Sequence, residues 1–171
     1  SRFSLVAAMN PCPCGYLGDP ARECRCSPGQ IEKYRQRISG PLLDRIDLHI
    51  DVPAVDYREL RTESGGESSA IIRERVEEAR SIQLERLVSF PGVNCNADMG
   101  NRQVSTFCRL DKRSEQTLEQ AMESLNFSAR AHDRILKVAR TLADLAGELE
   151  IKEFHVLEAI QYRTLDRNLW A

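Results

Sequence analysis

Residues 128–147 have the sequence SARAHDRILKVARTLADLAG, and their spacing predicts the best-defined helix of the chain. Ser128 is a residue type that caps helix N-termini, and Gly147 follows the last apolar residues, where helices commonly end. At 100° per residue, one broad face is apolar. It comprises Ile135, Leu136, Val138, Ala139, Leu142, Ala143, Leu145 and Ala146. This stretch therefore predicts a helix that packs within a helical bundle.

The opposite face of this helix carries Arg130, Arg134 and Lys137, which lie within about 60° of one another. A solvated polar face is the ordinary interpretation of such a stripe. Arg130, however, lies in the first turn, where a cation opposes the helix dipole. A cation in that position favours a nearby anion, and phosphate is a natural one.

The second half of the chain is predicted to be helical throughout. Besides 128–147, the expected helices span about 70–89, 100–108, 112–125 and 152–163. The segment 54–69 contains the run ESGGESS and predicts a flexible linker. The chain thus divides into an N-terminal part, residues 1–53, this linker, and a helical domain, residues 70–171.

The N-terminal part is predicted to mix strands with a helix. Residues 3–9 form a nearly continuous apolar run, which is typical of a strand buried on both faces. Residues 46–52 alternate strictly between apolar and polar side chains, which predicts a half-exposed edge strand. Between them, Ser27, Pro28 and Gln30 form a helix start signal, and the helix is expected to run through about Arg37.

Four cysteines cluster in this part with the pattern C-P-C-G-x8-C-x-C: Cys12, Cys14, Cys24 and Cys26. Four thiolates suit a tetrahedral zinc site, and a closed site of this kind would be structural. The C-x-C spacing is shorter than the usual C-x2-C pair, so each pair must bend back sharply. Free or redox-active thiols and disulfides stay open as alternatives.

Composition restricts the class of protein. The chain has 171 residues, a net charge of −2 and 42% hydrophobic residues, which predicts one globular domain or two small ones. The apolar run at 3–9 is far shorter than the roughly 20 residues that span a bilayer, so we expect no membrane partner and a cytoplasmic location. The near-neutral charge restricts any contact with nucleic acid or nucleotide to a local surface.

Three stretches together resemble the magnesium-chelatase-like AAA+ ATPases. They are residues 7–15 (AAMNPCPCG), 39–48 (SGPLLDRIDL) and 128–145, and they occur in the order of the family. The cysteine loop is similar to that of the competence-protein branch and absent from true chelatase subunits. The resemblance covers nearly the whole chain. It implies a mixed α/β remnant of an AAA+ core, containing the sensor-1 and last strands, followed by an all-α helical lid.

The resemblance also implies roles for individual residues. Asn10 resembles sensor 1, which orients the water that attacks the γ-phosphate. Arg45 is similar to an arginine finger that reaches the nucleotide of a neighbouring subunit. Arg130 resembles sensor 2, and Arg130 with Arg134 would contact the nucleotide from the lid. Phosphoryl transfer depends on such cations, because negative charge spreads over the transferred group. A strand terminus, a surface ion pair and a solvated helix face are the respective structural alternatives.

The chain departs from the family in one respect. It contains no G-x-x-x-x-G-K-[ST] loop and no apolar strand ending in paired acids, so nothing cradles the phosphates or holds Mg²⁺. We therefore expect the C-terminal part of a longer ATPase, inactive alone, whose partner is its own upstream core. Because a strand would be missing between 3–9 and 46–52, we expect residues 1–53 to be rearranged, disordered or paired with another copy.

The resemblance implies that the intact protein uses ATP and Mg²⁺ and forms a homo-oligomeric, hexameric ring. The implied function is an ATP-dependent branch-migration helicase that acts on branched DNA during natural transformation or recombination. One alternative is a chelatase-like ATPase that remodels a protein complex. Another is a zinc-stabilised nucleic-acid-binding or oligomerisation module, and a third is a helical interaction domain without catalysis.

Overall fold

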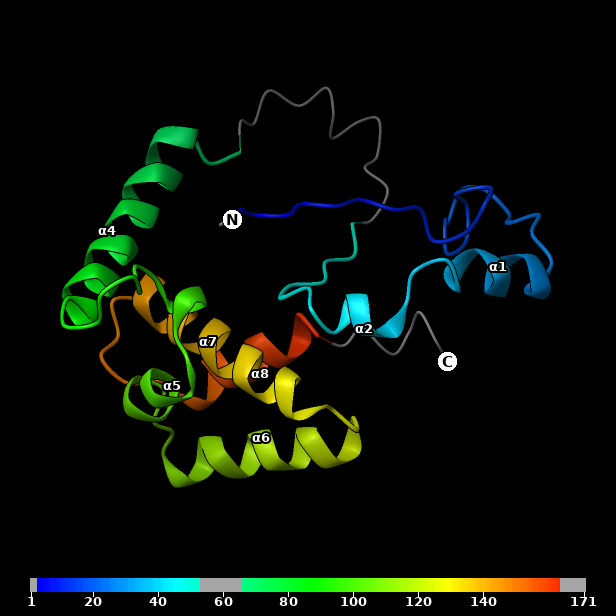
Figure 1. Ribbon diagram of the computed structural model, residues 1–171. Helices are drawn as coiled ribbons and strands as arrows, with labels where there is room; N and C mark the ends of the chain where they lie inside the picture. The colour runs from blue at the N-terminus through cyan, green and yellow to red at the C-terminus, as the bar shows by residue number, and fades with distance from the viewer. Residues whose placement is uncertain (1–2, 53–65, 164–171) are drawn as a thin grey trace.

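The computed structural model describes residues 3–52 and 66–163, and these residues are predominantly helical (Figure 1). The helices before the gap are α1, Pro28–Arg35, and α2, Gly40–Leu43. Those after it are α4, Ser69–Leu87; α5, Asn101–Phe107; α6, Lys112–Ser124; α7, Ala129–Leu145; and α8, Glu153–Gln161. A 3-10 helix, η1, spans Asn96–Asp98. The predicted linker lies largely outside the described residues.

The helices after the gap form one bundle around α7, as expected for a lid domain. Helices α8, α4 and α5 pack against α7, and α6 packs against α8. The apolar face of α7 lies in the core, where Ile135 and Ala139 are fully buried, together with Val156 from α8. Ser128 caps α7, because its hydroxyl accepts a hydrogen bond from the Ala131 amide at 3.2 Å. The bundle prediction is therefore confirmed.

Helix α4 is packed on the bundle at its C-terminal end and exposed to solvent at its N-terminal end. Its C-terminal half packs on the bundle through Ala79, Gln83 and Leu87, which are buried. Its N-terminal half extends beyond the bundle (Figure 1), and Ile72 and Val76 on the same face are exposed there. No described helix is both long and apolar enough to cross a membrane.

The prediction of two strands, at residues 3–9 and 46–52, is wrong. Residues 3–9 and 46–52 form no strand, and the pairing found among the described residues is one isolated bridge between Leu110 and Ile151. The side chains of Phe3 and Val6 are 79% and 95% exposed, so the apolar run is not buried. A strand requires hydrogen-bonding neighbours, and within residues 3–52 and 66–163 no backbone hydrogen bond is formed by residues 3–9. The helix predicted after Ser27 is confirmed, with a capping box between Ser27 and Gln30.

Candidate functional site

The four clustered cysteines converge on one point. Their Sγ atoms all lie within 4.8 Å of one another. The Cys12 sulfur lies 3.4 Å from that of Cys14 and 3.7 Å from that of Cys24, and the Cys14 and Cys24 sulfurs are 3.6 Å apart. A tetrahedral site with zinc–sulfur bonds of about 2.3 Å has sulfurs about 3.8 Å apart. The four thiols therefore have the spacing of a metal site and could hold a metal ion.

Local turns bring these thiols together. After Cys12 and Cys14 the chain reverses at Gly15, whose amide donates to the Cys12 carbonyl at 3.0 Å. Gly15 has a φ of +83°, which favours glycine because it has no Cβ. The C-x-C pair can thus bend back as sharply as a shared ion requires.

Backbone amides also prepare part of the cluster for metal binding. Hydrogen bonds from the backbone of Tyr16 and then Arg25 lower the pKa of Cys14 to about 6. A thiol must lose its proton to bind metal, so these amides favour the ligand form of Cys14. Burial, by contrast, raises the pKa of Cys26 to about 12, so this thiol loses its proton less readily than Cys14 does.

The segment that carries Arg45 lies against the lid. Asp44 accepts a hydrogen bond from the Ser128 hydroxyl at 3.0 Å, so it contacts the residue that caps α7. Leu43 is buried, and the amide of His49 donates to the carbonyl of Tyr162 at 2.8 Å. The side chain of Arg45 is exposed and donates to the Pro41 carbonyl at 3.3 Å.

The two arginines predicted to bind nucleotide have different surroundings. Arg130 is exposed in the first turn of α7. Arg134, one turn further, forms an ion pair with Asp47, so its charge already has a partner within the chain. Burial lowers the pKa of Arg134, and the positive charges of Arg163 and Arg45 act in the same direction. The junction between residues 43–49 and the lid thus brings several arginines together with the carboxylates of Asp44 and Asp47.

The structure brings some of the predicted catalytic residues together and not others. Arg45 and Arg130 belong to segments joined by the hydrogen bond between Asp44 and Ser128. Asn10 is exposed beside the cysteine loop, with its side chain near Gly15. No hydrogen bond or ion pair connects Asn10 to Arg45 or Arg130 within residues 3–52 and 66–163.

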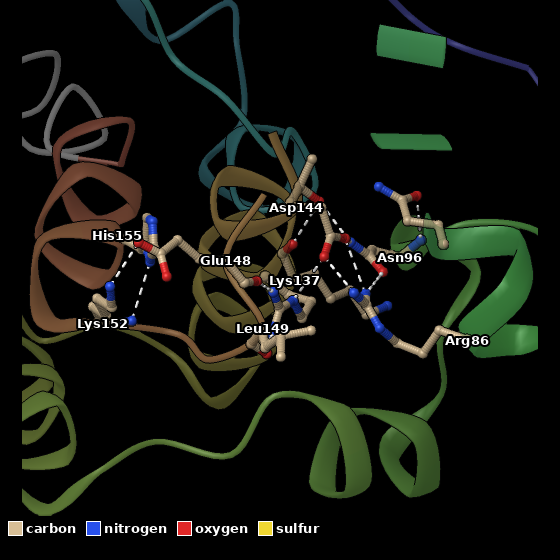
Figure 2. Close-up of polar contacts among 11 residues, drawn as sticks. Arg86, Asn96, Lys137, Asp144, Glu148, Leu149, Lys152 and His155 are labelled. Atoms are coloured by element: carbon tan, nitrogen blue, oxygen red, sulfur yellow. Dashed lines mark hydrogen bonds and ion pairs between the residues drawn. The ribbon is translucent and has the colours of Figure 1, made fainter. Parts of the chain in front are cut away.

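A buried polar network that sequence reasoning missed joins three parts of the lid (Figure 2). The Asp144 carboxylate forms a two-pronged ion pair with Arg86 of α4, with one contact at 2.9 Å. It also accepts from Arg140 Nε at 3.0 Å and from Asn96 Nδ2 at 2.8 Å. Asn96 Nδ2 lies 3.0 Å from the hydroxyl of Thr141 as well. Asp144 of α7 thus binds α4 through Arg86 and η1 through Asn96.

Arg140 extends this network to the loop after α7. Its Nη atoms donate to the carbonyls of Leu149 at 2.8 Å and Glu148 at 2.6 Å, so the loop carbonyls are satisfied inside the protein. Arg140 and Asp144 stand at i and i+4, the spacing of a helical ion pair, and this was the signal available in the sequence. The network is buried and its groups are partnered, so it has the character of a structural element.

Two family profiles match the chain. Residues 1–60 match "Magnesium chelatase, subunit ChlI", and residues 66–163 match "Magnesium chelatase, subunit ChlI C-terminal". The two matched ranges meet near the predicted linker.

Several curated proteins are similar over nearly the whole chain. Competence protein ComM of Haemophilus influenzae is 44% identical over 170 residues, which are 99% of this chain and 32% of that protein. The uncharacterized protein YifB of Escherichia coli is 40% identical over the same coverage. The uncharacterized protein Mb2921c of Mycobacterium bovis is 34% identical over 163 residues, 95% of this chain and 32% of that protein. The chain therefore spans about a third of the length of these relatives.

Proposed function

The chain belongs to the magnesium chelatase subunit ChlI family, and we propose that it forms the C-terminal part of an AAA+ ATPase motor. The observation that carries this proposal is the contact between Asp44 and Ser128. This contact puts the segment of Arg45 beside the start of the helix that carries Arg130. Two exposed arginines at one junction give this surface cations of the kind that phosphoryl transfer requires, because negative charge spreads over the transferred group.

Arg45 is proposed as the arginine finger. Its side chain is exposed, while its neighbours Asp44 and Ile46 accept hydrogen bonds from the lid. A finger needs this combination of a fixed backbone and an exposed guanidinium, because catalysis depends on a cation held in position. In a ring, such a residue stabilises the transition state at the neighbour's nucleotide, an effect worth ~10³–10⁵ in rate.

Arg130 is proposed as sensor 2 and Asn10 as sensor 1. Arg130 lies at a helix N-terminus, where the backbone also favours an anion. Arg134 would assist only after releasing Asp47, so its contribution to nucleotide binding is expected to be smaller than that of Arg130. Asn10 would join the site when the phosphate-binding core of the longer protein covers residues 3–9, and ATP and Mg²⁺ would bind to that core.

The four-cysteine cluster is proposed to hold a structural Zn²⁺. The sulfur spacing, the turn at Gly15 and the lowered pKa of Cys14 support a closed four-thiolate site. Such a site leaves no ligand position for substrate, so the ion would stabilise the loop and take no part in catalysis.

The substrate proposal is branched DNA. One relative of this chain is named a competence protein, and we extend that name to a branch-migration helicase that works as a homo-oligomeric, hexameric ring in the cytoplasm during transformation or recombination. A chelatase-like ATPase that remodels a protein complex would share the nucleotide chemistry, so only the response to DNA separates the two.

The test uses a protein of the length of the relatives, including the phosphate-binding core. ATP turnover is measured with and without a four-way DNA junction. We expect stimulation by DNA, and a loss of at least about 10³-fold in Arg45→Ala, because the contact between this cation and the transferred phosphoryl group is strongest in the transition state. Arg102→Ala serves as the control, since Arg102 is exposed on α5, away from the junction. Equal turnover in Arg45→Ala and Arg102→Ala would remove the finger assignment.

A second candidate function is a zinc-stabilised module that binds nucleic acid. Arg22 and Arg25 are exposed beside the cysteine cluster, and the Arg22 guanidinium also lies 5.1 Å from the centre of the Tyr16 ring. Phosphate contacts from such a patch are not sequence-specific and weaken steeply with salt. The module candidate predicts that Arg22→Ala combined with Arg25→Ala reduces the salt slope of DNA binding, whereas the motor proposal alone predicts no change in slope.

A further inference from the structure

Arg163 is a buried cation at the end of the lid. It lies two residues after α8, and its side chain is 1% exposed. A buried guanidinium is costly unless charges and hydrogen-bond acceptors surround it. Its partners include the Ile46 carbonyl, to which Nη1 donates, and the Asp44 carboxylate, 3.5 Å from Nη2. Both acceptors come from the segment around Arg45, more than 110 positions earlier in the chain.

The Asp44 carboxylate joins three parts of the molecule. Its Oδ1 atom accepts from Arg163 after α8 and from Ser128 before α7. Asp44 is 25% exposed on its side chain, so water weakens this junction less than it weakens a surface ion pair. One carboxylate therefore ties the start of α7 and the end of α8 to the chain immediately before Arg45.

Arg45 stands between the two acceptors of Arg163. Asp44 precedes it and Ile46 follows it, so Arg163 holds the backbone on both sides of the exposed side chain. Arg163 and Arg45 both lie close enough to Arg134 to lower its pKa, and Asp44 acts in the opposite direction. This arrangement fixes the backbone on both sides of Arg45, whose guanidinium is exposed and donates to the Pro41 carbonyl at 3.3 Å.

We propose that Arg163 is a positioning residue that clamps residues 44–46 to the lid and thereby sets the position of Arg45. The inference rests on the proposed role of Arg45 in ATP hydrolysis. It adds a mechanical consequence. Movement of α7 and α8 carries Arg45 with it, because Asp44 binds Ser128 at the start of α7 and Arg163 after the end of α8.

The test measures two quantities in the longer protein. The first is amide hydrogen exchange in peptides covering 43–49, and the second is kcat and KM for ATP. Arg163→Gln should raise exchange at 43–49 and lower kcat on the order of 10²-fold with KM unchanged, because misplacing a catalytic group by about 1 Å has such an effect. Arg163→Lys, which keeps the charge, should recover part of kcat.

Two further variants keep the test decisive. Arg113→Gln removes an exposed ion pair to Glu153 of α8 and should change neither quantity. Asp44→Asn keeps the side-chain shape and removes its charge, so it should reproduce the effects of Arg163→Gln. If Arg163→Gln raises amide exchange throughout the lid, the substitution has unfolded the domain. Exchange at residues 43–49 in Asp44→Asn then decides whether the clamp exists.

The outcomes separate this inference from the proposed function. Unchanged exchange at 43–49 in both Arg163→Gln and Asp44→Asn would overturn the clamp. Raised exchange with normal kcat would overturn its role in positioning Arg45. A wild-type protein without ATP turnover would overturn the proposed function, while the exchange measurement would still decide whether Arg163 holds the segment.

Discussion

The two described regions differ in the burial of their apolar side chains. One is the lid, residues 66–163, and the other is the segment before it, residues 3–52. In the lid, apolar helix faces meet in a common core, and Ile135 and Val156 are fully inaccessible. In the earlier segment, Phe3 and Val6 are almost fully exposed. There, order comes from a cysteine cluster and from contacts to the lid.

This difference indicates which region can fold by itself. Burial of apolar surface is the dominant favourable contribution to folding, and the lid has a core of its own. The run at 3–9 has none among the described residues; under the proposed function, the phosphate-binding core of a longer protein would cover its apolar side chains. We therefore expect perturbations of the lid to change global stability, and perturbations of residues 3–52 to act locally.

The largest decrease in the free energy of unfolding is expected for Asp144→Ala. Removing this carboxylate leaves Arg140, which is 3% exposed, and the partly buried Arg86 without their counter-charge. Breaking a buried ion pair by removing one partner costs about 3–5 kcal/mol. The free energy of unfolding, from urea denaturation followed by circular dichroism, should fall by that amount.

The matched control is Glu67→Ala, which breaks the exposed ion pair with Arg75 on α4. Exposed pairs contribute about 0–1 kcal/mol, so this variant should unfold close to the wild type. Similar losses in the two variants would contradict the assignment of the Asp144 network as the polar centre of the lid.

Removal of metal should produce the next largest effect, confined to the early segment. The chain is expected to bind one Zn²⁺, and replacing Cys12 and Cys14 by Ser should abolish binding, as measured by elemental analysis. Cys95→Ser is the control, because Cys95 lies outside the cluster. Chelation should increase amide exchange at residues 12–26 and leave exchange in α7 unchanged. Loss of α7 protection on chelation would mean that the two regions fold together.

Helix caps allow a finer comparison within the lid. Ser128→Ala removes the hydroxyl that caps α7 and contacts Asp44, and it should cost about 1 kcal/mol in urea denaturation. Ser68→Ala removes the cap of α4 at the end that extends beyond the bundle, 3.4 Å from the Ile71 amide. Because that end can fray without unfolding the core, its cost should be smaller. Equal costs would show that the α4 N-terminus contributes to the global transition.

The smallest change in the free energy of unfolding is expected from a change of pH. Burial, followed by the positive charge of Arg140, lowers the pKa of His155 below its ordinary value of 6.5. The folded state thus disfavours the protonated ring, so its stabilising contribution is complete above pH 6.5 and decreases as the pH falls below that value. Nδ1 of His155 accepts from the Lys152 amide at 3.1 Å. His155→Gln retains an acceptor at this position and should flatten the dependence of unfolding free energy on pH between about 7 and 5. An unchanged slope would exclude His155 as its source.

Features that depend on nearby residues were predictable from the sequence. Ser128 and the apolar spacing predicted α7, and the capping box at Ser27 predicted α1, because helices form from contacts within about one turn. The cysteine cluster was likewise predictable, since its four members lie within 15 positions of one another along the chain.

Features that depend on distant partners were not predictable in this way. The run at 3–9 has the composition of a buried strand, yet a strand needs a hydrogen-bonding neighbour, and the described part of the chain supplies none. Arg134 was expected to contact a nucleotide, but in the structure it pairs with Asp47, which lies 87 positions earlier. For the Asp144 network, the i,i+4 spacing to Arg140 was visible, while nothing in the sequence indicated that Arg86 would meet it from α4.

The most direct test of the central claim mixes subunits of the longer protein. Wild type and Arg45→Ala are combined in increasing proportions at constant total concentration, and DNA-stimulated ATP turnover is measured. If Arg45 acts on the nucleotide of a neighbouring subunit in a cooperating ring, turnover should decrease faster than the wild-type fraction. A decrease strictly proportional to the wild-type fraction, or none at all, would contradict the account.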